Sequence, residues 1–388
     1  MLKGLTKEEK RVIFGISFAV AVRMLGLFLL LPVLSPYLKT LEGATPFLIG
    51  LAIGVYGFSQ ASLQIPFGYL SDKLGRKPVI IFGMATYILG SLMGGMAKDI
   101  WFMVLARFIQ GFGAVSSAMT ALSADLTREE VRTLAFAFIG ASISLVFTLS
   151  IVFAPIVAGT LGVPFIFYLT AFLSLLATLY VALFIPEPKT HHREIEPTLR
   201  NFSLVLKDKN QAFLNLSIAL LHAFLVVVFT VVPYQLVYEY QFPKVQHWKV
   251  YLPALLLSLA LMVPSIVYAE SRKKFREVFL LGVLLITFGF LMSLLKNSFV
   301  ALVLLVFFFL LGFHLLEPII PSLLTRLTHR DIRGLSLGFF NTTQFVGAFL
   351  GGLWGGFVLK QGLIYMNTLG FLFSLLWFFG AYLWFKRL

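Results

Sequence analysis

The sequence contains no cysteine, which excludes disulfide bridges, thiolate chemistry and cysteine-ligated metal sites. Charge is also scarce, because Asp, Glu, Lys and Arg make up 12% of the residues, against about 25% in an ordinary soluble chain. No run matches the phosphate-binding pattern Gly-x-x-x-x-Gly-Lys-Ser/Thr, so the chain encodes no ATP-driven motor. We expect no cofactor, and energy drawn from an ion or substrate gradient.

Apolar residues dominate the composition. They make up 59% of the chain and the mean hydropathy is +0.93. Apolar runs of about 20 residues, enough for a helix to cross the bilayer, recur along almost the whole length. We therefore predict an all-α integral membrane protein with twelve transmembrane helices. The predicted spans are 11–38, 47–70, 78–97, 100–125, 133–160, 164–185, 211–239, 248–269, 277–295, 299–325, 334–359 and 363–385.

The basic residues are unevenly distributed between these spans. With the N-terminus in the cytoplasm, 23 of the 31 Lys and Arg fall on the cytoplasmic side and six on the other, as the positive-inside rule favours. The net charge of +14 therefore reports topology, and we expect no nucleic-acid partner. We expect a multi-pass protein of a bacterial or archaeal inner membrane, with both termini cytoplasmic.

One long polar interval, residues 186–210, divides six helices from six. We expect it to be a cytoplasmic linker between an N-terminal bundle, 1–185, and a C-terminal bundle, 211–388. The adjacent His191 and His192 could bind a metal, but neighbouring histidines on a linker are weak evidence. We therefore expect no metal site.

The two halves are related in sequence. With an offset of 201 residues, Gly111-Phe112 falls on Gly312-Phe313, and Arg132 falls on Arg333. Parallel six-helix repeats build transporters whose site lies near the midplane between the halves and is reached from each side in turn. We therefore predict two pseudo-symmetric six-helix bundles.

A charged turn, GYLSDKLGRK from Gly68 to Lys77, separates the second and third predicted helices. It closely resembles the G-x-L-x-D-[RK]-x-G-R-[RK] loop of the major facilitator superfamily. Gly68 would let the end of helix 2 approach a neighbour closely, and Gly75 would supply a backbone conformation that other residues resist. Asp72 would face a helix N-terminus or a base.

Further stretches carry the same resemblance. Arg107-x-x-Gln110-Gly111 is similar to the R-x-x-Q-G motif of helix 4, and residues 150–159 resemble the antiporter motif of helix 5, with Ser or Ala at several glycine positions. The segments around Arg23 and Asp125 resemble the drug:proton antiporter branch. Some members of this branch carry an extra soluble domain after helix 12, and we expect none here.

Small residues mark two helices of this pattern, the fifth and the eleventh. They are Pro155, Gly159, Gly351, Gly352, Gly355 and Gly356. Such spacing lets helices pack backbone to backbone in lipid. A packing seam and a role in setting the direction of antiport both explain these residues.

Five ionisable side chains lie well inside the predicted spans: Arg23, Arg107, His222, His314 and Glu317. They fall on helices 1, 4, 7 and 10, which line the central cavity in the superfamily that the chain resembles. Buried charge is expensive and normally faces a partner or a wet cavity. These residues, with Gln110, are therefore the candidate proton-coupling or substrate-binding positions.

Glu317 and His314 are three residues apart and share one face of helix 10. We hypothesise that Glu317, helped by His314, couples transport to protons. A static ion pair or hydrogen bond that stabilises helix packing is the alternative. A lone buried histidine is often satisfied structurally, so His222 has a weaker claim.

The two arginines differ in their expected surroundings. Arg107 lies three residues before Gln110 on the same helix face and matches the superfamily position implicated in proton transfer or substrate contact. Arg23 lies near the midplane, where a functional role and a structural contact with helix 5 or 11 are both open.

The charge tally bears on the substrate. The five intramembrane ionisable residues are two arginines, two histidines and one glutamate, and helix 1 has no acidic residue with which to bind a cation. The 42 Phe and 13 Tyr predict a partly aromatic cavity. We therefore expect neutral or anionic amphipathic substrates.

Charges at the cytoplasmic ends of helices 2 to 5 form a candidate inner gate, in which ion pairs close that face. A set of solvated surface charges is the alternative. The gate residues are Gly68, Asp72, Gly75, Arg76, Lys77, Asp125 and Arg132.

The sequence thus favours a transporter that exchanges a small molecule for protons by alternating access. A uniporter or symporter remains open, because several glycines of the helix 5 motif are replaced. A receptor or assembly factor on the same scaffold is a rival. We expect a monomer without enzymatic activity, since no catalytic constellation lies at membrane depth.

Overall fold

The computed structural model describes residues 5–188, 205–295, 298–329 and 332–388. Within these ranges twelve helical segments are long and apolar enough to span a membrane, as the sequence predicts. The first half comprises α1 (Lys7–Leu30), α2 (Leu34–Leu38), α3 (Pro46–Leu74), α4 (Arg76–Met96), α5 (Ile100–Gly111), α6 (Ser116–Asp125), α7 (Glu129–Thr160) and α8 (Val163–Phe184). The second half comprises α10 (Lys209–Tyr238), η1 (Lys244–Gln246), α11 (Trp248–Ser271), α12 (Phe275–Leu295), α13 (Phe299–Leu327), α14 (Arg333–Gln361) and α15 (Leu363–Arg387).

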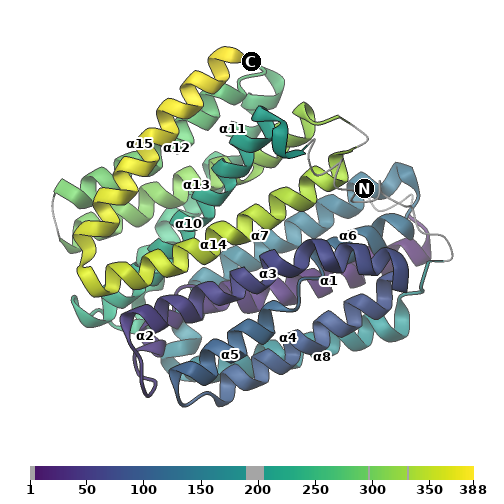
Figure 1. The fold of residues 1–388 in the computed structure, drawn as a ribbon, viewed down its shortest axis with the longest axis horizontal. Coiled ribbons are helices and arrows are strands. Elements are labelled where there is room, and N and C mark those ends of the chain that lie inside the picture. The colour runs from purple at the N-terminus through teal and green to yellow at the C-terminus, as the bar shows by residue number, and fades with distance from the viewer. Residues whose placement is uncertain (1–4, 189–204, 296–297, 330–331) are drawn as a thin grey trace.

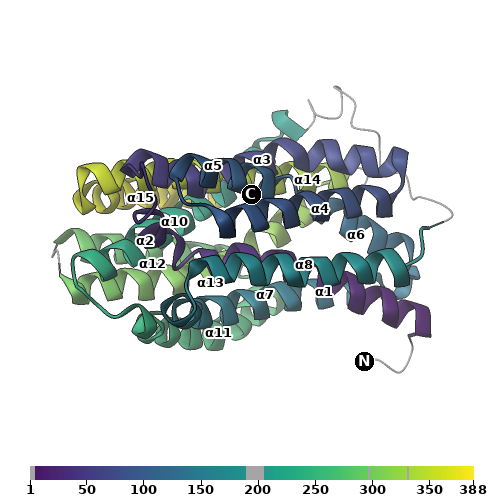
Figure 2. The same ribbon diagram turned by 90° about the horizontal axis from the view of Figure 1, so that it is seen from below.

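The two halves form two groups of long helices that lie side by side (Figure 1). Figure 2 shows the helices of both groups running in roughly the same direction. The start of α1 and the C-terminus lie toward one end of these helices, here called the termini end, together with the turns at Gly75 and Asp125. The opposite end, called the far end, carries Lys39 and Val245. His191 and His192 of the predicted linker lie outside the described residues.

The outer surface of both groups is apolar. Phe14, Leu183 and Leu376 are 74%, 72% and 67% exposed, a pattern that would be costly in water but suits contact with lipid chains. This surface and the number of long helices agree with an integral membrane protein.

Several helices begin at side chains that accept hydrogen bonds from otherwise unpaired backbone N–H groups. Thr6 and Glu9 form a reciprocal capping box at α1. Thr45, Asp99 and Ser298 cap α3, α5 and α13. These short polar residues therefore fix where the apolar helices start.

Two predicted spans are interrupted. The span 11–38 divides into α1 and α2 around Pro32, which has no N–H to continue the helix. The span 100–125 divides into α5 and α6 at residues 112–115, where Gly113 lies close to α4. A Cβ added to Gly113 would lie 2.9 Å from Tyr87 Cβ, so this close approach requires glycine.

The halves meet along a seam of small residues between α3 and α14. Gly50 and Gly54 on α3 face Gly352 and Gly356 on α14. A Cβ added to Gly352 would lie 2.6 Å from the Gly54 backbone nitrogen, and one added to Gly50 would lie 2.5 Å from the Gly352 carbonyl oxygen. The two backbones therefore touch without intervening side chains.

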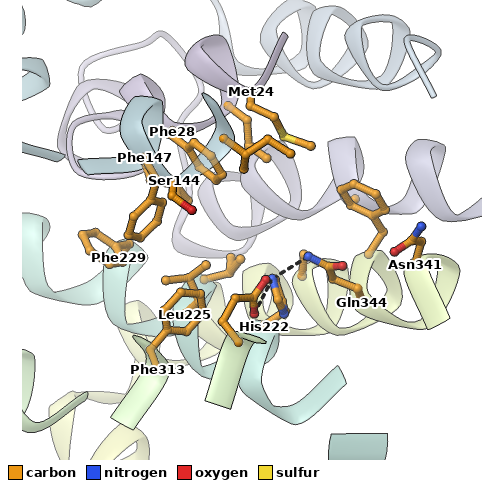
Figure 3. Close-up of a pocket in the computed structure, with 18 of the residues that line it drawn as sticks. Met24, Phe28, Ser144, Phe147, His222, Leu225, Phe229, Phe313, Asn341 and Gln344 are labelled. Carbon is orange, nitrogen blue, oxygen red and sulfur yellow. Dashed lines mark hydrogen bonds and ion pairs between the residues drawn. The ribbon is translucent and has the colours of Figure 1, made fainter. Parts of the chain in front are cut away.

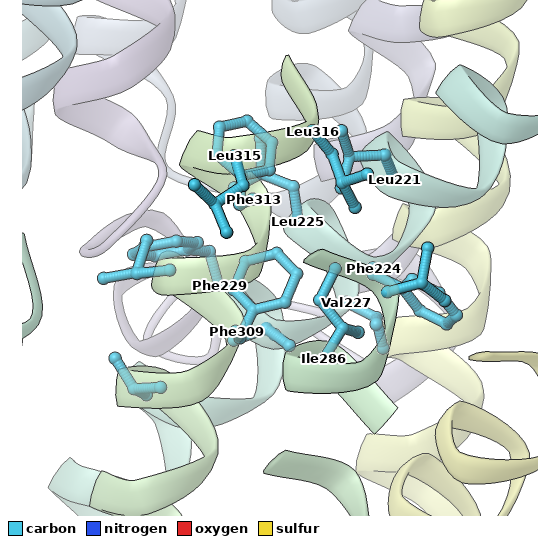
Figure 4. Close-up of a cluster of buried hydrophobic side chains, with 14 of the residues drawn as sticks. Leu221, Phe224, Leu225, Val227, Phe229, Ile286, Phe309, Phe313, Leu315 and Leu316 are labelled. Carbon is cyan, nitrogen blue, oxygen red and sulfur yellow. The ribbon is translucent and has the colours of Figure 1, made fainter. Parts of the chain in front are cut away.

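The core of the second half is built mainly from aliphatic and phenyl side chains of α10, α12 and α13 (Figure 4). Phe224 packs against Phe290 with ring centroids 5.3 Å apart. Side chains of α10 and α13 belong to the same buried cluster, and dense packing of this kind keeps the two helices at a defined spacing. The polar groups that these two helices carry toward the other half are thereby held in register.

We predict that Gly352→Ala destabilises the protein, because the added methyl group must push α3 and α14 apart. Overpacking of this type costs about 1–3 kcal/mol. The matched control is Gly338→Ala on the same helix, where an added Cβ meets nothing within 4 Å and alanine is the better helix former. Thermal unfolding in detergent should give a lower melting temperature for Gly352→Ala than for Gly338→Ala, and equal melting temperatures would contradict the seam.

Candidate functional site

A cavity of about 520 Å³ lies between the halves. Residues of α1, α3 and α7 form one side of it, and residues of α10, α11, α13 and α14 form the other. Phe28, Phe147, Phe229 and Phe313 supply much of its wall (Figure 3). The predicted aromatic character of the cavity is therefore present, and an apolar or aromatic molecule would contact rings from both halves.

A polar cluster interrupts this apolar wall. His222 of α10 lies beside Gln344 of α14, with Gln344 Nε2 2.7 Å from His222 Nε2 (Figure 3). Glu317 of α13 approaches the same nitrogen, with Oε2 at 3.9 Å. Three helices thus direct one histidine, one amide and one carboxyl group to a single point in the cavity.

Glu317 is the less satisfied member of this cluster. Its Oε2 atom is buried and has no hydrogen-bond partner in the described part of the chain. A carboxylate oxygen without a donor in such a place is costly, and taking up a proton removes that charge. The group is therefore placed to exchange a proton with the cavity.

His314 does not join Glu317 as the sequence predicts. Its Nδ1 bonds to the Leu310 carbonyl oxygen at 2.8 Å, and its ring packs edge-on against Phe147 and Phe313. Both residues line the cavity, but the histidine at ion-pair distance from Glu317 is His222. A spacing of three places His314 and Glu317 on one face of α13. The contact that Glu317 makes depends instead on the residue that faces it from the neighbouring helix, which is His222.

Arg107 lies at the wall of the cavity in α5 and is 2% exposed. Its guanidinium donates to Gln110 Oε1, as their spacing predicts, and lies over the Tyr56 ring at 4.6 Å. Gln110 in turn donates to Ser91 at 2.8 Å. Arg107 is therefore a cation with a defined orientation at the cavity wall. Gln110, which does not line the cavity, holds it in that orientation.

Arg23 is fully buried, and its described hydrogen bonds go to α3 and to the break between α5 and α6, not to the fifth or eleventh membrane helix as one of the two predicted roles requires. Its guanidinium donates to Ser116, to the Gly113 carbonyl oxygen at 3.4 Å and to Gln60 Oε1 at 3.5 Å. Breaking a helix leaves backbone carbonyls without their usual partners. Arg23 thus donates hydrogen bonds to polar groups at the interruption between α5 and α6.

The candidate inner gate is tied together within the first half. Arg76 pairs with Asp72 and, through Nε at 3.1 Å, with Asp125. Arg132 instead donates to the Ala124 carbonyl oxygen. These contacts bring the gate residues together, and whether they close the face in another conformation stays a prediction.

In the charged turn, Asp72 faces a base, Arg76, which is one of its two predicted alternatives. Glu187 accepts from the first N–H groups of α4, at 2.7 Å from Arg76 N and 2.9 Å from Lys77 N. Gly75 has the expected positive φ of 99°. One detail of the charged turn differs from the sequence interpretation. Gly68 makes no close approach, because a Cβ there would lie 3.5 Å from Ser117 Oγ, an ordinary contact.

The far end is where the halves contact each other through polar side chains. Tyr238 donates to the Pro36 carbonyl oxygen at 3.0 Å, and Lys39 Nζ lies 4.0 Å from the centroid of the Tyr238 ring. At the termini end, the ion pairs recorded in the described ranges each join residues of one half. The described polar contacts between the halves therefore lie at the far end.

The small residues of helices 5 and 11 occupy packing positions. Gly159 faces Val245 beside η1, and Pro155 lines a smaller cavity of about 190 Å³ at the far end. On α14, Gly351 faces the Ala223 backbone and Gly355 faces Thr230, both on α10. Gly352 and Gly356 face α3, so α14 packs between α10 of its own half and α3 of the other half.

Sequence reasoning missed three residues that shape this region: Gln344, Tyr56 and Glu187. Gln344 is one of several amides at membrane depth, and nothing in its neighbourhood links it to His222, 122 positions away. Tyr56 is one of 13 tyrosines. A search for uncharged polar groups on predicted spans would have found Gln344, but not its partner.

Comparison with known proteins gives a consistent result. The sequence matches the Major Facilitator Superfamily over residues 16–352. It is 38% identical over 357 residues to the inner membrane transport protein YajR of Escherichia coli K12, covering 91% of this chain and 78% of that protein. It is also 28% identical over 342 residues to the multidrug resistance protein MdtH of Aeromonas hydrophila, covering 86% and 84%.

Solved structures show the same fold. A bacterial homologue of the human lysosomal transporter Spinster, crystallised in an inward-facing and unoccupied conformation, aligns with a TM-score of 0.79 at 13% identity. The alignment covers 97% of this chain and 98% of that one. At this identity the likeness concerns the arrangement of the helices.

We predict that Arg23→Met lowers the melting temperature in detergent, because the buried Gly113 carbonyl, Ser116 and Gln60 lose their donor. Each unsatisfied buried group costs about 1–3 kcal/mol. The control is Arg326→Met, since the Arg326–Glu270 pair is half exposed and such pairs contribute about 0–1 kcal/mol. Equal effects of the two substitutions would show that Arg23 does not hold the helix interruption.

Proposed function

The chain belongs to the major facilitator superfamily, and we propose that it is a secondary active transporter that exports a small neutral or anionic amphipathic molecule in exchange for protons. The observation that carries this proposal is the cavity shared by both halves, in whose wall Glu317, His222 and Gln344 converge. Alternating access uses a cavity between repeats, and a titratable carboxyl group in that cavity is a candidate proton-coupling site.

The described conformation supports one half of such a cycle. The glycine seam and the Lys39–Tyr238 contact hold the far end together. We propose that the termini end is cytoplasmic, because most Lys and Arg lie there. The structure then corresponds to an inward-facing state, and opening the far end requires α3 and α14 to separate.

Proton coupling is assigned to Glu317 with His222. In the inward-facing state Glu317 can release a proton to the cavity, and in the outward-facing state it can take one from outside. Export against proton entry follows if substrate and proton occupy the cavity in turn. The inner membrane and multidrug names of YajR and MdtH agree with this direction and location.

The substrate class follows from the charges at the cavity. Arg107 contributes a permanent positive charge, and Glu317 is the acidic residue among those that line the described cavity. With Arg23 buried away from this wall, the balance is less positive than the sequence suggests: Arg107 and Glu317 cancel when Glu317 is ionised, and the cavity is positive and disfavours cations when Glu317 is protonated. The apolar wall around these groups suits an amphipathic molecule.

We predict that aryl carboxylates, aryl sulfonates and neutral amphipathic compounds raise the melting temperature of the purified protein, since ligands that bind the folded state stabilise it. Arg107→Met should abolish the shift from the anions and leave most of the shift from the neutral compounds. A quaternary ammonium dye is the comparison compound. Equal or greater stabilisation by that dye would contradict the substrate class.

We predict that Glu317→Gln eliminates uptake driven by a pH gradient in proteoliposomes, using the compound that gives the largest melting shift. The amide keeps the size of the side chain but cannot exchange a proton. Counterflow of the same compound without a pH gradient is the internal control for folding and binding, and it should persist. Undiminished pH-driven uptake would exclude Glu317 as the coupling site, and absence of pH-driven uptake in the wild type would favour a uniporter.

A further inference from the structure

Both ring nitrogens of His222 are engaged in the described conformation. Nδ1 lies 3.2 Å from the Ile218 carbonyl oxygen, and Nε2 lies 2.7 Å from Gln344 Nε2. A carbonyl oxygen can only accept and an amide nitrogen can only donate. His222 is therefore neutral, with the proton on Nδ1 and the lone pair of Nε2 occupied by Gln344.

That lone pair also lies close to Glu317, whose Oε2 is 3.9 Å from Nε2. The other titratable or charged groups at the cavity in the described chain are Tyr56 of α3, Arg107 of α5 and His314 of α13; α7, α11 and α14 bring none to it. His314 uses its own Nδ1 within α13. Gln344 and Glu317 thus compete for one atom.

Gln344 lies where the second half meets the first. Its helix, α14, packs against α10 of the same half through Gly351 and against α3 of the other half through Gly352. The next residue, Phe345, packs against Tyr56 of the other half. When α3 and α14 separate, α14 loses its contacts with the first half and keeps those with α10. A resulting shift of α14 along α10 would change the distance between Gln344 and His222.

We propose that Gln344 is a positioning residue that holds His222 neutral and that withdrawal of its amide from Nε2 opens this nitrogen to the proton of Glu317. In that step the O–H bond of protonated Glu317 breaks and the Nε2–H bond of His222 forms, which leaves a carboxylate and an imidazolium as an ion pair. The inference rests on the proposed proton coupling. It adds the residue that links this coupling to the movement of α14.

The test is nitrogen NMR of protein labelled with ¹⁵N-histidine in lipid bilayers, with the proton as the only ligand. The His222 signals are assigned by their loss in His222→Asn. Wild type should show a protonated Nδ1 and a bare Nε2. In Gln344→Leu the single-tautomer signal should be lost, because Nε2 becomes free to bind the Glu317 proton. The matched control is Asn341→Leu, one turn away on the same wall, which should keep the wild-type signals.

A second variant covers the case in which Gln344→Leu does not fold. Gln344→Glu has the same shape but accepts where the amide donates, so it should place a proton on Nε2. The link to Glu317 is tested by adding Glu317→Gln to each background. Its effect on the His222 signals should be small with Gln344 present and large in Gln344→Leu, because coupled residues are not additive.

Unchanged His222 signals in Gln344→Leu or Gln344→Glu would overturn the proposal, as would an equal effect of Asn341→Leu. So would an equal effect of Glu317→Gln in both backgrounds. These outcomes are separable from the proposed function. If Gln344 has no such role, Glu317→Gln still eliminates pH-driven uptake; if transport is not proton-coupled, that uptake assay fails whatever the histidine signals show.

Discussion

The cost of leaving a polar group without a partner inside a membrane governs most of this structure. Arg23 is fully buried, yet its charge is distributed over the carbonyl and side-chain oxygens left open by the interruption of helix 4. Arg107 is held between Gln110 and the Tyr56 ring. Glu317 Oε2 has no hydrogen-bond partner in the described chain, and neither do the Nε atoms of both arginines. Glu317 differs from them because it is the acidic residue that lines the described cavity, and a carboxyl group can gain and lose a proton. The account of function depends on that property.

A second constraint acts through shape. The glycines of α3 and α14 bring two backbones into contact near the far end, and large side chains such as Phe345 and Tyr56 take over toward the middle. The halves are in close contact at the glycines and are held farther apart where the large rings lie. The cavity lies between the halves. Because α14 also packs on α10 through Gly351, the helix that seals the far end is the one that carries Gln344 to His222. In our proposal, conformation and protonation are connected through this single helix.

The sequence predicts the fold well, because long apolar runs must become helices in lipid and their ends are marked by capping residues and charged turns. Most helix limits agree within a few residues. The site was predicted only as a set of positions, four of whose five ionisable members line the cavity. Partners were predicted poorly: His314 shares a helix face with Glu317, but His222 meets it from α10, and Arg23 turns to α3 and the helix 4 break. Periodicity places a side chain on one helix, whereas contacts across helices depend on packing that one sequence does not encode locally.

The central claim is that Glu317 gains and loses a proton inside the cavity. Infrared difference spectroscopy of the protein in lipid bilayers, recorded between alkaline and acidic pH, tests it most directly because it detects the carboxyl group without needing a substrate. The account predicts a protonated-carboxyl band at acidic pH that is absent in Glu317→Gln and is altered in His222→Asn, since the two side chains share the site. A difference spectrum unchanged by Glu317→Gln would contradict the claim.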